Sequence, residues 1–574
     1  MLATLGQGFW RGAILPLLLL TFLVCLFPLA SDYVLFHPDE RHYVDAGLEM
    51  LDSGDYLSPR RADGGLRLKK PVIPYWFVTA GFHAVGVSVL GSRIVFLLAG
   101  AALIALSWWT AWIAFESRKA ALFAAVAAMC HPALLISAPR SIPDICLALS
   151  ILISTAGFVG ILKQQRVSLG WLLLAYGGGA LAVLSKGLPA AAFVGYASLF
   201  VLIRTPQLVR RNWAAFLTAG IMCAAVSASW FVLMAQMHQE ELVQQFTRDQ
   251  VGHGRFARSH WQTLIQFPMC LGMLAVTLSP WLIPAARGLR SRSRQFRSIL
   301  RQPHVQLLLG WSLLFCVLAS FINHVTMRYL LPVVPALAIV CGGLLSRCDS
   351  RIIRTSLRWV LLCALPCLAV GAALAVLGAS GRSPVLITGV LAACAVPVLW
   401  RLSSRFSSTG QGVATSVVWH AAVLLGTLGI SPFVLPDFGD RVIARLHEVN
   451  ADPAQPVVLI GDPAHATRIR LSSRNETKVI RFKHPEEAAV AEPQILVLEE
   501  GALPISELAT HRLAEVPCGF HPLSTNEVVT AAVEGKLPRL LDEHRRHYVL
   551  AVPKDEIART AHSDSQVEGD EIVR

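Results

Sequence analysis

The sequence predicts a polytopic α-helical membrane protein with about 13 transmembrane helices and a C-terminal α/β extracytoplasmic domain. Hydrophobic residues make up 54% of the 574-residue chain and charged residues only 15%, whereas soluble domains carry about 25% charged residues. Apolar runs recur through the first three quarters of the chain, with the ~17–25 residues that a helix needs to cross a bilayer. After Pro436 the composition becomes that of a soluble α/β fold.

The apolar runs place the predicted spans. The first, Ile14 to Ala30, has a basic flank like a signal peptide, but no small-residue cleavage site precedes the acidic loop, so we expect it to be retained. The spans lie roughly at residues 11–30, 91–115, 119–137, 143–162, 170–185, 187–203, 214–236, 264–285, 305–322, 330–346, 358–378, 384–400 and 413–435.

Basic residues fall in alternate loops, and the positive-inside rule assigns those loops to the cytoplasm. The odd number of spans then puts the C-terminal region outside, and we predict a multi-pass protein of the cytoplasmic (inner) membrane. The net charge of +13 therefore reflects topology and anionic lipid headgroups rather than nucleic acid. The basic loops contain Arg118-Lys119, Lys163 with Arg166, Arg204 with Arg210-Arg211, Arg287 to Arg301, Arg347 to Arg358, and Arg401 with Arg405.

The remaining loops share the outer face, at residues 31–90, 138–141, 185–187, 237–263 and 323–329. In the first, an apolar stripe of Val44, Leu48 and Leu51 predicts a helix from Pro38 to Leu51 along the membrane surface. We expect a second interfacial segment over residues 71–82. Residues 237–263 begin as an amphipathic helix and end in a Gly-rich, basic loop around His253 that could close over a lipid headgroup.

We expect three parts in the chain: a transmembrane domain over 1–436 with outside loops 31–90 and 237–263, an α/β domain over 437–554, and a disordered tail over 555–574. In the α/β domain we predict strands at 457–460, 478–482, 494–498 and 547–552, and helices at 441–450, 484–492, 504–512 and 525–534. The 12 cysteines lie mostly in apolar runs and show no metal-binding spacing, and we predict no disulfide for Cys518.

The outer loops bring together residue types that suit a lipid-phosphate donor. Lysines and arginines can bind a phosphate and stabilise charge on it as it departs, while an aspartate can take the proton of an attacking hydroxyl. Simpler roles remain open: Asp39 could cap a helix, Lys186 could snorkel, and Arg140 with Asp144 could be a structural ion pair. Tyr75 and Trp76 could be membrane-interface aromatics.

Five motifs in order resemble one known family. Asp39-Glu40-Arg41-His42-Tyr43 with Ser53-Gly54-Asp55-Tyr56 is similar to its D-E-x-R-Y…S-G-D-W motif, and Lys70 to Trp76 to its E-K-P-P-x-x-Y-W motif. Arg140-Ser141…Asp144, Leu184 to Gly187 and Arg328 to Ala336 resemble its other three. The family is that of GT-C glycosyltransferases using polyprenyl-phosphate sugars, in the group of bacterial aminoarabinose transferase and protein O-mannosyltransferases.

The resemblance implies an inverting sugar transfer from a polyprenyl-phosphate donor to a lipid, glycan or protein acceptor on the outer face, by a monomer embedded in membrane lipids. It implies Asp39, with Glu40 beside it, as the catalytic carboxylates. The residues it implies around the donor phosphate and sugar are Arg41, His42, Tyr43, Lys70, Arg140, Asp144, Lys186, Arg328 and Tyr329.

The chain departs from the family at three positions, one of which is the lysine that the family has ahead of its last motif and this chain lacks. His42 stands where the motif has arginine, and Lys69 where it has the glutamate that helps to hold a divalent metal in the aminoarabinose enzyme. A metal is therefore possible but not predicted, no other cofactor is expected, and another sugar or acceptor is favoured. The competing interpretations are a transporter or flippase of lipid-linked sugars, which should show repeats and broken helices, and a noncatalytic scaffold.

Overall fold

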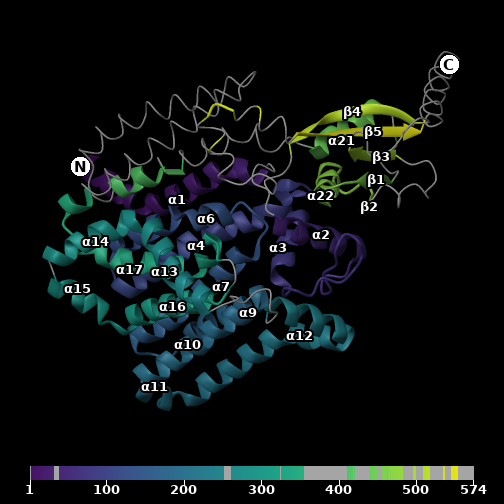
Figure 1. Ribbon diagram of the computed structural model, residues 1–574. Helices are drawn as coiled ribbons and strands as arrows, with labels where there is room; N and C mark the ends of the chain where they lie inside the picture. Colours follow the sequence, from purple (N-terminus) through teal and green to yellow (C-terminus); the bar gives the residue numbers. More distant parts are fainter. Residues whose placement is uncertain are drawn as a thin grey trace, which may run out of the picture.

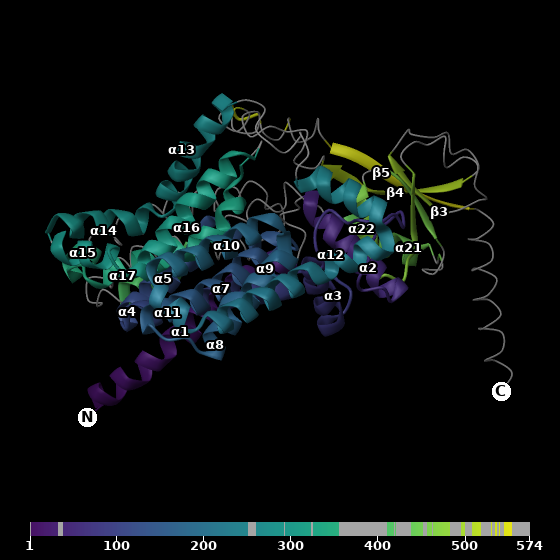
Figure 2. The same cartoon turned by 90° about the horizontal axis from the view of Figure 1, so that it is seen from below.

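A computed structural model shows a bundle of apolar helices with a five-stranded sheet at one end (Figure 1). The structure describes residues 2–31, 38–250, 260–291, 293–322, 325–354, most of 410–420 and, in shorter pieces, 438–553. In both views the sheet lies beside α2 (Pro38–Ser53), whereas α14 (Ser279–Ser291) and α15 (Ser293–Leu300) lie at the opposite end of the bundle (Figures 1 and 2).

The described residues contain seven helices that are long and apolar enough to cross a membrane, or eight if one bent pair counts as a span, so the chain is a multi-pass membrane protein. Helix α10 (Leu188–Arg204) is apolar but shorter. Of the predicted spans, 358–378, 384–400 and most of 413–435 lie outside the described residues. The seven helices are α1 (Leu2–Ser31), α4 (Val89–Phe115), α7 (Pro143–Gln164), α8 (Leu169–Leu172) continued by a π-helical turn (Leu173–Gly177) and α9 (Gly178–Lys186), α12 (Trp213–Gln250), α16 (Pro303–Ser320), and η2 (Met327–Val333) continued by α17 (Val334–Ser346).

The prediction of one continuous span over 119–137 was wrong. The segment forms α5 (Arg118–Met129) and α6 (Pro132–Ser137), separated at His131. A residue before proline is pushed out of the helical region, and His131 is extended at φ −75° and ψ 127°. Its Nδ1 accepts the amide of Ala133 at 3.1 Å, which caps the second helix.

The predicted span over 264–285 is also interrupted. Helix α13 (His260–Thr277) and α14 meet at an angle of 83°, directly before Pro280, which lacks the N–H that a continuous helix would need. The two interruptions touch, because the hydroxyl of Thr277 lies 2.8 Å from Nε2 of the buried His131. The short helix α11 (Pro206–Arg211) joins α10 to α12.

The segment between α1 and α4 contains α2, where a helix was predicted, and α3 (Ile73–Val85), where a second interfacial segment was predicted. The apolar stripe of α2 does not face a membrane: Val44 and Leu48 are fully buried in the protein core. Gly54 ends α2 with φ +70°, a left-handed conformation that favours glycine. The connection between α2 and α3 is held by α12, whose Gln245 accepts the amide of Leu68 at 3.0 Å.

The C-terminal sheet has the strand order β2-β1-β3-β5-β4. The neighbours of β1 are parallel to it and β5 is antiparallel to β3 and β4. All four residues of β1 are buried, as expected of a central strand in a parallel arrangement. The strands are β1 (Val457–Ile460), β2 (Val479–Phe482), β3 (Ile495–Glu499), β4 (Leu508–Pro517) and β5 (Arg545–Pro553), with helices α21 (Phe438–Glu448) and α22 (Pro463–Ser472).

Four of these strands were predicted, and the predicted helix over 504–512 was wrong. Residues 508–517 pair with β5 from Leu508 opposite Pro553 to Pro517 opposite Arg545, and such tertiary pairing overrides a weak local preference. Helix α22 was not predicted. The predicted helix at 484–492, most of that at 525–534 and the tail 555–574 lie outside the described residues.

Candidate active site

Asp39 and Glu40 lie in the first turn of α2, where the helix dipole favours carboxylates. The side chain of Asp39 is 50% exposed, and its Oδ2 accepts a hydrogen bond from Nη2 of Arg328 at 2.8 Å. Arg328 comes from η2, 289 residues later in the chain. Asp39 is therefore oriented by the Arg328 cation and remains accessible to solvent and substrate.

Arg328 continues this contact to a second carboxylate. Its Nη1 lies 3.6 Å from Oδ2 of Asp144, and Nζ of Lys186 lies 2.5 Å from the other oxygen of Asp144. Asp144 is in the first turn of α7 and Lys186 in the last turn of α9, the positions at which helix dipoles favour these charges. The four side chains Asp39, Arg328, Asp144 and Lys186 form a continuous chain of alternating charge, which we call the charge chain.

Tyr329 supports the two cations of the charge chain. Nζ of Lys186 lies 4.7 Å from the centre of its ring, and the guanidinium carbon of Arg328 lies 5.0 Å from it. Both distances are within the range of cation–π attraction. The ring therefore holds the two cations near each other although they carry like charge.

Arg140 adds a third cation to this region. It forms no ion pair with any described residue, and its buried Nε has no hydrogen-bond partner there. Burial lowers the pKa of Arg140 to about 10, with smaller effects from Glu40, which opposes the shift, and from Arg93 and Arg328. The side chain stays protonated at neutral pH, so it is a charge that the described chain leaves uncompensated.

Glu40 does not face the charge chain. Its two oxygens accept Nε and Nη2 of Arg93 at 2.7 and 2.9 Å, and Oε1 also accepts the amide of Ser141 at 2.9 Å. Glu40 is fully buried and Arg93 is 1% exposed, so a substrate cannot reach this carboxylate. The geometry is that of a structural ion pair between α2 and α4, and the catalytic role of Glu40 stays a prediction that this geometry does not favour.

Arg93 was not among the predicted site residues. Its position inside a predicted apolar helix indicated a buried partner, since an unpaired arginine is costly there. Nη1 of Arg93 also donates to the carbonyl oxygen of Leu29 at 2.9 Å. This side chain therefore joins the end of α1, the start of α2 and α4 beneath the site.

Four other predicted site residues lie between α1 and α4. Tyr43 is 3% exposed and packs on Tyr75 with ring centres 5.2 Å apart. Burial raises the pKa of its phenol, and the nearby carboxylates Asp39 and Asp144 act in the same direction. Lys70 is 7% exposed. Neither Tyr43 nor Lys70 is at the surface, whereas Arg41 is partly exposed.

His42 is neutral in this setting. Burial lowers its pKa to about 3, and the positive charges of Arg67 and Arg41 add to the effect. Lys69, an exposed cation, stands at the position of the metal-binding glutamate of the resembling family. A cation is not a metal ligand, so this part of the chain does not fit a divalent ion, and no step below uses one.

The chain is similar in sequence to known proteins over part of its length. The sequence pattern of the family described as dolichyl-phosphate-mannose-protein mannosyltransferase matches residues 14–243. An undecaprenyl phosphate-alpha-4-amino-4-deoxy-L-arabinose arabinosyl transferase from Sodalis glossinidius is 26% identical over 353 residues, which cover 60% of this chain and 61% of that protein. An uncharacterized protein from Aquifex aeolicus is 29% identical over 218 residues, 37% of this chain and 42% of that one. The chain thus spans less than two thirds of the length of these relatives.

The likeness to solved structures extends over almost the whole chain. The crystal structure of ArnT from Cupriavidus metallidurans in the apo state matches with a TM-score of 0.69 and 18% identity, covering 95% of this chain and 98% of that one. The same protein bound to undecaprenyl phosphate matches with a TM-score of 0.68 and 19% identity, covering 94% and 98%. The fold is therefore the one those structures share, as the sequence predicted.

Proposed function

We propose that this chain, which has the GT-C fold of those structures, is an integral membrane glycosyltransferase. It moves a sugar, with inversion, from a polyprenyl-phosphate donor to a lipid, glycan or protein acceptor on the outer face of the cytoplasmic membrane. The observation that carries the proposal is the charge chain, with the half-exposed Asp39 at one end and the uncompensated Arg140 near it. The names of the matched family and of the Sodalis relative support a polyprenyl-phosphate donor.

The donor phosphate binds among the cations. Arg140, Lys186 and Arg328 exceed the carboxylates Asp39 and Asp144 by one positive charge. Lys70 and Arg41, which also belong to the predicted donor site, add to this excess. A sugar phosphodiester carries one negative charge and fits this excess. Its oxygens accept hydrogen bonds from the guanidinium of the partly exposed Arg140, and Tyr329 holds Lys186 and Arg328 close to each other.

Asp39 acts as the general base. It takes the proton of the acceptor hydroxyl as that oxygen attacks the anomeric carbon from the face opposite the phosphate. The bond from the anomeric carbon to the phosphate oxygen breaks, and its electron pair leaves with the lipid phosphate. Arg140, Lys186 and Arg328 stabilise the charge that develops there, which is the larger part of such catalysis.

The remaining predicted residues complete the proposal. Tyr43 and Lys70 form the buried wall of the donor site, and Arg41 and His42 its rim, with His42 as a neutral hydrogen-bonding group. Glu40 is a positioning residue through Arg93. Because His42 and Lys69 depart from the family motif, the sugar or acceptor differs from that of the aminoarabinose enzyme. Residues 437–554 form the outer α/β domain, on the side of Asp39, a placement supported by the contact of α22 with α2.

The test is transfer by purified full-length protein with a panel of polyprenyl-phosphate sugars and a membrane extract as the source of acceptors. Asp39→Asn keeps size and hydrogen bonding but removes the base. We expect wild type to transfer sugar and Asp39→Asn to lose more than about a hundredfold in rate while binding polyprenyl phosphate as wild type does. Asp55→Asn, a change of the same kind elsewhere in the loop, serves as the matched control.

Two results contradict the proposal. If Asp39→Asn transfers sugar as fast as wild type, Asp39 is not the base. If neither protein transfers sugar, but wild type moves the donor across liposome membranes, the chain is a transporter.

A further inference from the structure

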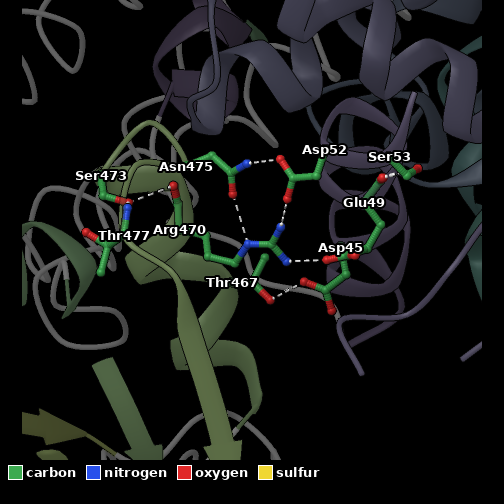
Figure 3. A network of polar contacts seen from close by, with 9 residues as sticks. All are labelled: Asp45, Glu49, Asp52, Ser53, Thr467, Arg470, Ser473, Asn475 and Thr477. Atoms are coloured by element: carbon green, nitrogen blue, oxygen red, sulfur yellow. Dashed lines mark hydrogen bonds and ion pairs between the residues drawn. The ribbon is translucent and has the colours of Figure 1, made fainter. Parts of the chain in front are cut away.

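A second cluster of charge lies on another face of α2, away from the charge chain. Asp45, Glu49 and Asp52 follow one another at i, i+4 and i+7, so they share one side of the helix. This side meets α22 and the turn after it, more than 400 residues later in the chain (Figure 3). Three adjacent carboxylates repel one another unless a cation lies between them.

Arg470 provides that cation. Its Nη1 lies 2.8 Å from Glu49, its Nη2 lies 3.1 Å from Asp52, and its Nε donates to Oδ1 of Asn475 at 2.9 Å (Figure 3). Asn475 in turn donates to Asp52 at 2.7 Å. Every nitrogen of the guanidinium is used, and the side chain is only 9% exposed. Because the guanidinium is planar and bound at three of its nitrogens, it fixes the orientation of α22 relative to α2 as well as the distance between them.

A further hydrogen bond lies one turn nearer the site. The hydroxyl of Thr467 donates to Oδ1 of Asp45 at 2.7 Å, and Asp45 is 5% exposed. Thr467, Arg470 and Asn475 therefore hold the middle and the end of α2. We call these three residues the α22 clamp.

The carboxylates that the α22 clamp binds lie on the same helix as Asp39. Helix α2 has 16 residues, and Asp39 precedes Asp52 by 13 positions, about 20 Å along the axis at ~1.5 Å per residue. The start of the helix is held by Glu40 and Arg93, and its middle by Val44 and Leu48 in the core. The α22 clamp binds the far end and restricts its tilt, and such a tilt would shift Asp39 relative to Arg328.

We propose that Arg470 is a positioning residue for Asp39, so that the C-terminal α/β unit takes part in sugar transfer by holding the catalytic helix in register. The inference rests on the proposed function of Asp39. It gives the unit a role that requires no contact with donor or acceptor. Arg470 acts on the geometry of the base and not on the phosphate site.

The test compares Arg470→Ala and Arg470→Lys with wild type in the full-length protein. We expect Arg470→Ala to lower kcat between about tenfold and a hundredfold, the scale of a misplaced catalytic group, with affinity for polyprenyl phosphate unchanged within twofold. Arg470→Lys keeps the charge but loses the fork, and should recover part of kcat. Arg445→Ala is the matched control and should behave as wild type, since the one partner of Arg445 among the described residues is the exposed Glu448 in α21 of the same unit.

Hydrogen exchange gives a readout that does not depend on activity. Arg470→Ala should raise exchange in residues 38–53 and leave β1 and β3 protected. The proposal is overturned if α2 exchanges as in wild type, if kcat is unchanged, or if β1 and β3 lose protection equally with α2, which would mean that Arg470 only stabilises the unit. Because exchange and phosphate binding are measured without transfer, a wild-type protein that transfers nothing contradicts the proposed function alone, and the effect on α2 is still decided.

Discussion

At the scale of single residues, the site joins side chains from four distant parts of the chain. Asp39, Asp144, Lys186, Arg328 and Tyr329 were selected from the sequence because the charge pattern of the loops put them on one face, and the structure brings them into contact. Arg93 and Arg470 could not be selected in that way. Arg93 could be noticed as an arginine inside an apolar helix, and Arg470 could not, but in neither case does sequence spacing reveal the partner, which lies 53 or 421 residues away.

The first prediction concerns Arg140. Arg140→Gln removes a cation that has no counter-ion within the described residues, so the protein should fold normally and bind the donor less well. Loss of one charge-assisted hydrogen bond costs about 1.5–3 kcal/mol, or roughly tenfold to 150-fold in Kd. Titration of the purified protein with polyprenyl phosphate measures this. Arg166→Gln, in a loop of the opposite face, is the control, and equal affinities for Arg140→Gln and wild type would remove Arg140 from the phosphate site.

The second prediction concerns the buried pair of Glu40 and Arg93. Arg93→Ala leaves Glu40 buried without its partner and should lower stability by about 3–5 kcal/mol. Thermal unfolding in detergent measures the change. Glu116→Gln is the comparison, because the pair of Glu116 with Lys163 is exposed and should contribute about 1 kcal/mol or less. A Glu40→Gln protein with wild-type stability and no transfer would restore a catalytic role to Glu40.

At the scale of elements, α2 presents three faces to three surroundings. One carries Asp39 toward the charge chain, one packs Val44 and Leu48 into the core, and one binds α22. The sequence predicted the helix and its apolar stripe correctly but assigned the stripe to a membrane surface. Periodicity reports that one side of a helix is apolar, and it does not distinguish lipid from protein as the cover. The broken spans at His131 and Thr277 were missed for a related reason, since hydropathy is uniform across a break.

The third prediction is a pH dependence at the interface of α2 and α22. Burial raises the pKa of Asp45 to about 6, against the opposing effects of Thr467, Arg41 and Arg470, while Glu49 adds to the rise. The folded protein therefore keeps a proton that the unfolded chain releases near pH 4. The contribution of Asp45 to stability falls as pH rises from about 4 to 6 and is constant above that.

Asp45→Asn should remove this loss. Its melting temperature should exceed that of wild type at pH 8 and approach it near pH 4. The corresponding difference in the free energy of unfolding is up to about 3 kcal/mol, for a rise of roughly two units in the pKa of Asp45. Asp55→Asn should show the opposite sign, because hydrogen bonds from Leu57 and Ser58 outweigh burial and lower the pKa of Asp55. Parallel melting curves for Asp45→Asn and wild type over this range would contradict the assignment.

At the scale of the whole molecule, the positions of the basic helices and of the sheet at opposite ends of the bundle follow from charge and hydropathy, both of which can be determined from the sequence. The basic helices α14 and α15 lie at one end of the bundle, and the sheet and α2, the helix that carries Asp39, lie at the other (Figures 1 and 2). Strands β1, β3 and β5 could be predicted because buried apolar runs are distinctive. Strand β4 could not, since its pairing with β5 joins residues that are distant in sequence.

The fourth prediction is the orientation of the two ends. Glu476→Cys, exposed after α22, should react with a membrane-impermeant maleimide on the outer face of the cytoplasmic membrane. Arg297→Cys, exposed on α15, should react only after the membrane is permeabilised. Labelling of Arg297→Cys in intact cells, with Glu476→Cys protected, would invert the topology and place Asp39 in the cytoplasm.

The separation of 421 residues between Glu49 and Arg470 also sets an order of assembly. Helix α2 is synthesised early, and domains fold roughly from the N-terminus during synthesis. Its carboxylates have no Arg470 to bind until nearly the whole chain has been made. A nascent chain that has already inserted its phosphate-binding helices therefore lacks a fixed base. The protein gains its geometry for transfer only when translation is almost finished, so prematurely terminated chains would bind lipid phosphate without acting on it.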